Sequence, residues 1–236
     1  PLSEHHLALC CTVGIIAIFA YINSRGASEA GLVGNVITSA KVIILLAFVG
    51  FGMYGIGGNP NWTANFSDGL LPNGIGGVFI AMGMTFIAFE GYEIIAQSGE
   101  EVRNPTHNIP RAIFYSIIIV VIMYVMIGFV VIGAVVPPPG IYVWEYLAGA
   151  KEVAIVRAAE QFMPIGGILI LISGLASTMS ALNATIYSSS RVSFAMGRDN
   201  NLPSAFGLIH PNLHTPHWAV IMSAILVVVM GMTLVF

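Results

Sequence analysis

The sequence contains very little charge and very little cysteine. Only 8% of its 236 residues are charged, whereas 57% are hydrophobic. A soluble domain carries about 25% charged residues, so this composition excludes a single globular domain folded in water. The two cysteines, Cys10 and Cys11, are adjacent and lie in an apolar stretch, which excludes a disulfide framework. We interpret them as packing residues, with palmitoylation near a helix end as the alternative.

The sequence contains long runs of apolar residues. A helix needs about 20 apolar residues to cross a hydrocarbon core, and six segments come near this length. We place them near residues 6–22, 35–57, 75–98, 110–136, 164–190 and 217–236. The predicted fold class is therefore all-α, a polytopic membrane protein, with residues 1–236 forming one partial membrane domain. The chain opens with Pro1 rather than Met and stops within its last span at Phe236, so we expect both ends to be cuts through a longer protein.

The basic residues predict the orientation of these spans. Five arginines lie in alternate loops, whereas the lysine and arginine at 151 and 157 share one loop on the other side. The positive-inside rule therefore places loops 23–34, 99–110 and 191–216 in the cytoplasm and loops 58–74 and 137–163 outside. Glycosylation-type sequons at Asn61 and Asn65 fall in an outward loop. The apolar residues Val153, Ile155, Val156 and Phe162 predict a short amphipathic helix at the outer interface.

The third span holds two acids on either side of a glycine. Glu90 and Glu93 flank Gly91 in the stretch "FIAFEGYEIIAQ". A charged group within a membrane helix costs a few kcal/mol and is kept where it faces a bundle interior or a water-filled cavity. Gly91 weakens the helix by about 1 kcal/mol relative to alanine. The combination predicts a discontinuous helix whose unwound backbone lines a polar cavity.

The alternative is that both acids lie near the cytoplasmic end and reach the interface or pair with Arg103. Fourteen helical steps, about 21 Å, separate Gly76 from Glu90, and the hydrocarbon core is about 30 Å thick. This length argues against the alternative for Glu90. Glu93 lies about 4–5 Å further along the helix, and both interpretations stay open for it. Beyond the acids, Pro110 is predicted to occupy the first turn of the next helix, where its missing N–H costs nothing.

Lys41 is the charged residue of the second span, about a third of the way in from its cytoplasmic end. One interpretation is that the side chain extends back to the interface. The other is that the ammonium points into the bundle, occupies a cation position and exchanges a proton with the transport pathway. The periodicity of the span does not decide between them.

The fifth span carries a face of small residues. Ser177 and Ser180 lie at helical spacing in "ISGLASTMSALNATIYSSSR", so they can serve close helix contacts and interhelical hydrogen bonds, or act as oxygen ligands for an ion. Three histidines follow at 210, 214 and 217, separated by Pro211 and Pro216. We interpret them as loop residues rather than a metal cluster, and we expect no metal and no cofactor.

Three stretches together carry a family resemblance. The stretch "FIAFEGYEIIAQSGEEVRNPTHNIPRAI" resembles the sixth helix and following cytoplasmic loop of the amino acid–polyamine–organocation (APC) permeases. The stretch "ALNATIYSSSRVSFAMGRDNNLPSAF" is similar to the end of that family's eighth helix, and "YINSRGASEAGLVGNVITSAKVIILLAF" to the junction of its fourth and fifth helices. The chain thus resembles the fourth to ninth helices of a permease, nearest to cationic amino acid transporter-like and bacterial or archaeal members.

This resemblance implies an inverted-repeat fold of two five-helix halves, with substrate held between two helices that are broken at mid-membrane. On matching positions, the interruption falls around Ile87–Gly91, and Lys41 falls where some relatives place a lysine in the position that other members of the fold use for sodium. The resemblance therefore implies proton coupling through Lys41. The substrate-binding residues that it implies are Ile87, Ala88, Phe89, Glu90, Gly91, Tyr92 and Glu93, with the backbone of Ile87, Ala88 and Glu90 facing the α-amino group.

Two departures from the family pattern matter. Glu90 stands where an apolar residue is usual, so either the substrate is cationic or this acid takes part in the coupling. The family's first helix, with its glycine-rich substrate loop, is missing, as are the tenth helix and those beyond. We therefore expect that this segment alone does not transport.

The predicted function is secondary active transport of amino acids by alternating access, coupled to protons, with sodium as the other candidate ion. We expect an integral protein of the cell membrane that binds no nucleic acid and is not an enzyme. A non-transporting scaffold or sensor that keeps the permease fold is the alternative. An intramembrane protease using Glu90 and Glu93 is disfavoured, because no span carries an aspartate pair or a His-Glu-x-x-His motif.

Overall fold

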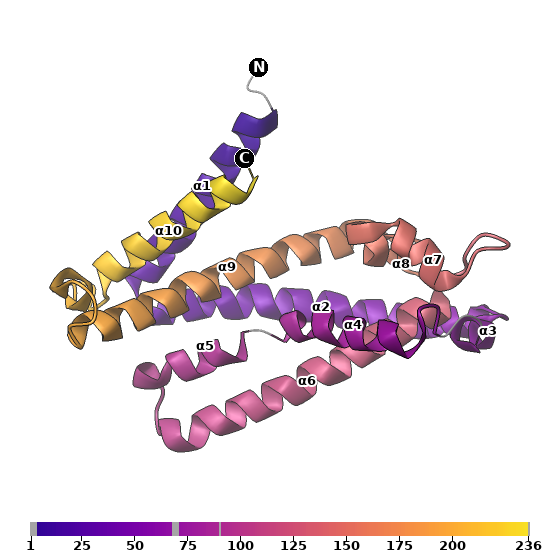
Figure 1. Cartoon of the computed structure of the whole chain (residues 1–236), viewed down its shortest axis with the longest axis horizontal. Coiled ribbons are helices and arrows are strands. Elements are labelled where there is room, and N and C mark those ends of the chain that lie inside the picture. The colour runs from indigo at the N-terminus through magenta and orange to yellow at the C-terminus, as the bar shows by residue number, and fades with distance from the viewer. Residues whose placement is uncertain (1–3, 68–70, 90, 236) are drawn as a thin grey trace. The chain divides into compact units, whose positions relative to one another are not determined.

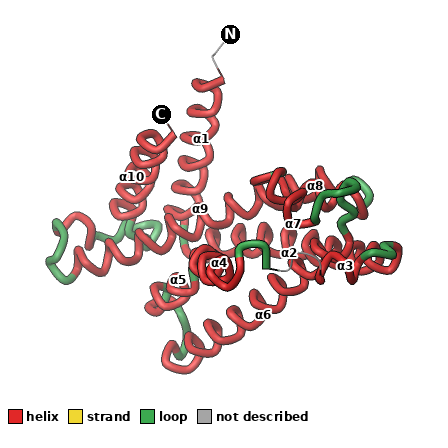
Figure 2. Tube along the Cα trace, turned by 45° about the vertical axis from the view of Figure 1, so that its right-hand side comes forward, coloured by secondary structure: helices red, strands yellow, loops and turns green. Residues whose placement is uncertain are grey.

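The computed structural model describes residues 4–67, 71–89 and 91–235, and within these ranges the chain is helical with no strand (Figure 2). The all-α fold class is therefore confirmed. In chain order (Figure 1) the α-helices are α1 Glu4–Arg25, α2 Ala27–Gly58, α3 Trp62–Ser67, α4 Gly74–Ala88, α5 Tyr92–Gln97, α6 Pro105–Ala134, α7 Val143–Gly149, α8 Ala154–Phe162, α9 Gly166–Arg198 and α10 His217–Val235. Short 3₁₀ turns lie at η1 Gly99–Glu101, η2 Lys151–Val153 and η3 Ser204–Gly207.

The helices have the length and composition of membrane spans. Within the described ranges, α2, α6 and α9 are long and apolar enough to cross a bilayer, and α1, α4 and α10 contain shorter apolar helices. Large apolar side chains point outward from them: Phe86 is 75% exposed and Leu226 62%. Exposed apolar surface of this extent is unfavourable in water and suits contact with lipid. The chain is therefore an integral membrane protein with several spans.

The chain divides into two compact units. Unit 1 comprises residues 1–39, 94–105 and 176–236, and unit 2 comprises residues 40–93 and 106–175. In unit 1, α1 and α10 lie side by side, and their apolar faces bury Ile16, Phe19 and Val220 together with Ile186 of α9. Because each helix presents apolar side chains on the face that meets its neighbours, this cluster forms the core of the unit.

Unit 2 has its own core, built from α2, α6, α7 and α8. Phe48 and Val130 are fully buried there, and Phe48 packs against Phe162 with ring centroids 5.1 Å apart. Two asparagine side chains donate hydrogen bonds to backbone carbonyls at the end of α6, where the last carbonyls have no partner within the helix. Asn59 Nδ2 donates to the carbonyl of Gly133 at 2.9 Å, and Asn65 Nδ2 donates to the carbonyls of Ile132 and Val135, each at 2.9 Å. The amide of the Asn65 sequon is thus engaged within the fold.

Three expected boundaries were wrong. Instead of a loop over 23–34, only Gly26 separates α1 from α2, and its φ of +150° is open to glycine and strained for other residues. Pro105, not Pro110, opens α6; Pro110 lies inside that helix. Helix α9 continues to Arg198 and occupies the start of the predicted loop 191–216.

The segment 137–163, which was predicted to lie outside, contains two short α-helices, α7 and α8, rather than one. In α8 and its flanks, Val156 and Phe162 pack against the core of unit 2, and Ala158 and Ala159 are fully buried. Val153 and Ile155 are exposed instead. The predicted apolar face was therefore only half correct, because small alanines rather than the larger residues make the closest approach to the core.

Gly52 offers a test of the packing in unit 2. A Cβ added there would collide with Cγ1 of Val130 on α6, whereas one added to Gly50, on the same helix, meets nothing within 4 Å. Overpacking a tight helix contact costs about 1–3 kcal/mol. We expect Gly52→Ala to lower the thermal unfolding temperature of the detergent-purified protein. Gly50→Ala should keep that temperature or raise it, because alanine favours the helix. Equal unfolding temperatures for the two variants would contradict the close contact of α2 with α6.

Candidate functional site

The predicted interruption of the third span is present in the structure. Helix α4 ends at Ala88 and α5 begins at Tyr92, and Phe89 and Gly91 lie in turns between the two helices. Gly91 has φ +114°, a conformation that glycine adopts far more readily than any residue with a Cβ. Glu90 lies outside the described residues, and Ile87 and Ala88 are described by their backbone alone.

Glu93 makes a hydrogen bond at the interruption. Its Oε2 accepts a hydrogen bond from the backbone N–H of Gly91 at 2.9 Å. A helix begins with backbone N–H groups that lack an intrahelical partner, and an acid in the first turn also interacts favourably with the positive end of the helix dipole. Glu93 thus stabilises the start of α5, in the manner of the acid in a capping box. The sequence identified the residue, but not this role.

The end of α4 leaves acceptors at the interruption. The N–H of Phe89 donates a hydrogen bond to the carbonyl of Phe86 at 3.1 Å. Because α4 ends here, no further turn of the helix supplies N–H donors for its last carbonyls. Helix C-termini carry partial negative charge. The backbone of Ile87 and Ala88 therefore provides a place suited to a cationic or N–H-bearing group.

The two aromatic residues at the interruption differ in their surroundings. Phe89 packs edge-to-face on Tyr124 of α6, with ring centroids 5.4 Å apart and an interplanar angle of 71°. Tyr92 is 47% exposed. Phe89 is therefore anchored to α6, whereas the ring of Tyr92 has room to contact another group.

Lys41 lies deeper in its helix than expected. Because α2 begins at Ala27 rather than near residue 35, Lys41 is fourteen steps, about 21 Å, from the start of the helix. Its side chain is partly buried, and it forms no salt bridge with another described residue.

The two serines of the fifth span, now in α9, also differ. The hydroxyl of Ser180 lies 3.2 Å from that of Thr38 on α2, at hydrogen-bonding distance, whereas Ser177 is exposed. Ser180 therefore makes a contact between helices. On the loop before α10, the His210 ring accepts hydrogen bonds at 3.2 Å from the N–H groups of Asn212 and Leu213, so this histidine holds the loop.

Two polar clusters in unit 1 were missed by the sequence analysis. In the first, Asn23 Nδ2 of α1 donates to Asn183 Oδ1 of α9 at 2.8 Å, and Asn183 Nδ2 donates to the carbonyl of Ala30 at 3.1 Å. Both amides are buried. A lone amide within an apolar helix indicates such a contact, but it does not say which helix supplies the partner.

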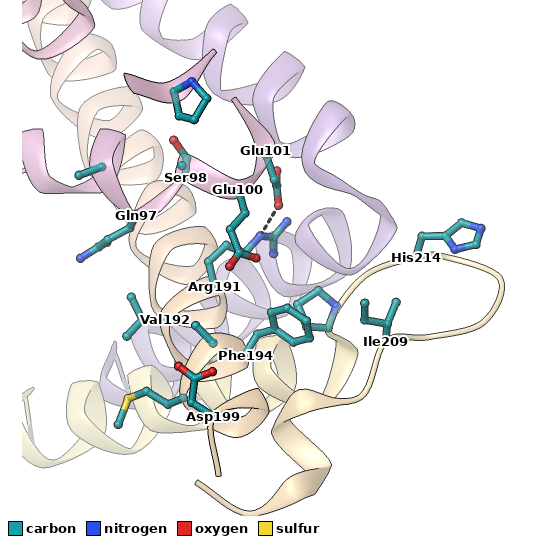
Figure 3. A pocket seen from close by; sticks show the side chains of 16 residues that line it. Gln97, Ser98, Glu100, Glu101, Arg191, Val192, Phe194, Asp199, Ile209 and His214 are labelled. Atoms are coloured by element: carbon teal, nitrogen blue, oxygen red, sulfur yellow. Dashed lines mark hydrogen bonds and ion pairs between the residues drawn. The ribbon is translucent and has the colours of Figure 1, made fainter. Parts of the chain in front are cut away.

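The second cluster joins η1 to the C-terminal part of α9. Arg191 Nε donates to Glu101 Oε1 at 2.8 Å, and the hydroxyl of Tyr187 donates to Glu101 Oε2 at 2.7 Å. Glu101 and Arg191 border a cavity of about 600 Å³, with Gln97 and Ser98 on one side and Arg191 and Val192 on the other (Figure 3). His214 lies on the far loop and points away from the ion pair (Figure 3). The two consecutive glutamates in "GEEVRNP" belong to the loop motif that carries the family resemblance, but that motif did not indicate their contacts with α9.

These features define an α-helical membrane protein with a discontinuous helix, an arrangement that secondary transporters use for substrate sites. A family model described as amino acid permease matches residues 3–236. The chain therefore belongs to the amino acid permease family, within the APC superfamily that the motifs indicated.

Individual relatives support the same family. The chain is 32% identical over 207 residues to an uncharacterized protein of Methanocaldococcus jannaschii, covering 87% of this chain and 45% of that protein. It is 30% identical over 202 residues to the methylthioribose transporter of Bacillus subtilis (86% and 41%). It is 29% identical over 206 residues to the branched-chain amino acid permease of the same organism (87% and 41%). The chain spans less than half the length of these curated relatives.

Proposed function

We propose that the full-length protein carrying this sequence moves an amino acid across the cell membrane by alternating access, coupled to protons. The interruption at Phe89–Gly91 in an otherwise apolar helix is the observation that carries the proposal. Irregular backbone in a membrane helix is tolerated where it is buried in protein or lines a water-filled cavity. Membership of the amino acid permease family supports the same conclusion.

The proposed substrate site uses backbone rather than charged side chains for the common part of an amino acid. The carbonyls of Ile87 and Ala88, at the negative end of α4, accept hydrogen bonds from the α-amino group. Tyr92 lies beside the substrate, and Phe89 supports the turn through its contact with Tyr124. Glu90 either recognises a cationic substrate side chain or takes part in the coupling.

Coupling is proposed to pass through Lys41. A protonated ammonium in the partly buried position on α2 supplies the positive charge that a bound cation supplies in sodium-driven relatives of this fold. Loss of the proton removes that charge. The proton gradient can therefore drive the conformational cycle if the two protonation states favour different conformations.

Uptake by the reconstituted full-length protein tests the proposal. Liposomes are preloaded to impose a pH gradient and are offered labelled amino acids that are cationic, branched-chain or small and neutral. Methylthioribose is added to the panel because one relative is named for it. We expect accumulation of at least one amino acid that collapses when an ionophore removes the gradient. No uptake across the panel would favour the scaffold or sensor. Uptake driven by a sodium gradient instead would identify sodium, rather than the proton, as the coupling ion.

Two substitutions of Glu93 test whether transport requires its hydrogen-bond acceptor or its negative charge. Glutamine keeps an oxygen that can accept the Gly91 N–H, whereas alanine removes it. Loss of a helix N-terminal cap costs about 0.5–2 kcal/mol. We therefore expect Glu93→Gln to keep most of the uptake and Glu93→Ala to lose several-fold more, at equal amounts of reconstituted protein. Equal losses in both variants would show that the charge, rather than the acceptor, is required.

A further inference from the structure

The segment Ile94–Pro105, called the arm here, follows the interruption and belongs to unit 1, whereas Glu93 and α4 belong to unit 2. The arm contains most of α5 and the turn η1. Its polar side chains meet one face of α9, because Tyr187, Arg191 and Arg198 lie four and seven residues apart and recur on the same side of the helix. The arm is thus joined to α9 by side chains from both segments.

Glu101 is held by two residues of α9 at once. Each of its carboxylate oxygens accepts one hydrogen bond, from Arg191 Nε at 2.8 Å and from the Tyr187 hydroxyl at 2.7 Å. The guanidinium of Arg191 also lies 4.3 Å from the centre of the Tyr187 ring and donates to the Ser190 hydroxyl at 3.0 Å. The three side chains therefore form a closed triangle in which each contacts the other two.

The ion pair of this triangle, Glu101 with Arg191, is less exposed than the neighbouring ion pair, Glu100 with Arg198. The Arg191 side chain is 9% exposed and Glu101 35%, whereas Arg198 and Glu100 are 52% and 61% exposed. Exposed ion pairs contribute little because water and salt screen them. The Arg191 side chain is nearly buried, so removing Glu101 leaves the guanidinium charge without compensation, which is unfavourable. Glu101 and Arg191 are therefore expected to dominate the attachment of the arm, and Glu100 with Arg198 to contribute little.

We infer that Glu101 and Arg191 are positioning residues that hold the arm against α9 and thereby set the width of the adjacent cavity. The arm lines one side of that cavity and α9 the other (Figure 3), so separating them widens it. The arm is also the chain that continues from the interruption, so its attachment controls the mobility of the proposed substrate site. This inference rests on the proposed function for its effect on transport, but its structural part does not.

A distance measurement tests the structural part without transport. In the full-length protein, with Cys10, Cys11 and any further cysteine replaced by serine, spin labels are placed at Gln97 on the arm and at Asn201 after α9. We expect one narrow distance distribution in this background. Glu101→Gln and Arg191→Gln should each lengthen and broaden it, whereas Glu100→Gln, the matched control, should leave it unchanged.

The charge-reversed double variant Glu101→Arg with Arg191→Glu keeps an ion pair and should restore the narrow distribution. Tyr187→Phe keeps the ring but removes one hydrogen bond, and should give an intermediate broadening. An unchanged distribution in both Glu101→Gln and Arg191→Gln would overturn the inference, and so would equal effects of Glu100→Gln and Glu101→Gln.

Uptake kinetics test the functional consequence. We expect Glu101→Gln to lower the maximal rate about tenfold with little change in KM, because none of the three residues of the triangle is among those proposed to bind the substrate. The charge-reversed double variant should recover most of that rate. A rise in KM with an unchanged maximal rate would contradict a positioning role. Absence of uptake in the unsubstituted protein would reject the proposed function, while the distance measurement would still decide whether the arm is held by this pair.

Discussion

Replacing Lys41 by arginine in the full-length protein is expected to abolish proton-driven accumulation. Arginine keeps the positive charge and a similar length but cannot be deprotonated in a protein. If the coupling cycle requires the ammonium to lose its proton, the variant is locked in one charge state. Lys41→Ala removes the charge altogether and should uncouple transport as well. The measurement is uptake into liposomes with and without an imposed pH gradient, with exchange of internal for external substrate as a second readout.

The matched control is Lys151→Arg, since Lys151 is an exposed lysine in η2 and lies outside the long apolar helices. It should keep gradient-driven uptake at the level of the unsubstituted protein. If uptake by Lys41→Arg still follows the pH gradient, Lys41 is not the coupling residue. The acids at the interruption, Glu90 and Glu93, would then be the groups to test next.

Replacing Gly91 by valine is expected to give the second large loss. Gly91 has φ +114°, and holding a residue with a Cβ in such a sparsely populated conformation costs about 1–3 kcal/mol. A Cβ at this position meets nothing within 4 Å, so the expected effect comes from the backbone conformation rather than from crowding of the Cβ. The interrupted conformation should therefore become rarer, and uptake should fall on the order of 10- to 100-fold.

Gly83→Ala provides the comparison for this variant. Gly83 lies inside α4, a Cβ there also meets nothing within 4 Å, and alanine favours the helix. Its uptake should match that of the unsubstituted protein when both are reconstituted at equal amounts. If Gly91→Val also transported normally, the unusual backbone conformation at Gly91 would not be needed for transport.

Local sequence signals predicted the main elements for clear reasons. The apolar runs are long enough to be recognised without a partner, because crossing a bilayer requires about 20 such residues. The interruption was predictable because Gly91 weakens a helix and the neighbouring acids require polar surroundings. Both signals lie within a few residues of the feature that they predict. The same holds for the family motifs, which are continuous stretches.

Helix ends were less predictable, because hydropathy reports where the apolar core of a helix lies and not where its hydrogen bonds stop. Helix α2 begins at Ala27, ahead of its apolar run, since a single glycine suffices for the turn from α1. Pro105 opens α6 although Pro110 also fits a first turn by sequence. Both errors changed the predicted position of a residue within its helix. The first placed Lys41 too near the start of α2, and the second placed Pro110 at the start of α6 rather than inside it.

The sequence by itself determined that this chain is an α-helical membrane protein of a permease family with an interruption beside Gly91, because those properties depend on composition and on neighbours in the chain. Only the tertiary structure decided which side chains meet. Asn23 and Asn183 are 160 positions apart, and Glu101 and Arg191 are 90 apart. Periodicity shows that a helix has a polar face, but the face that it meets depends on how distant helices pack, and no local pattern contains that information.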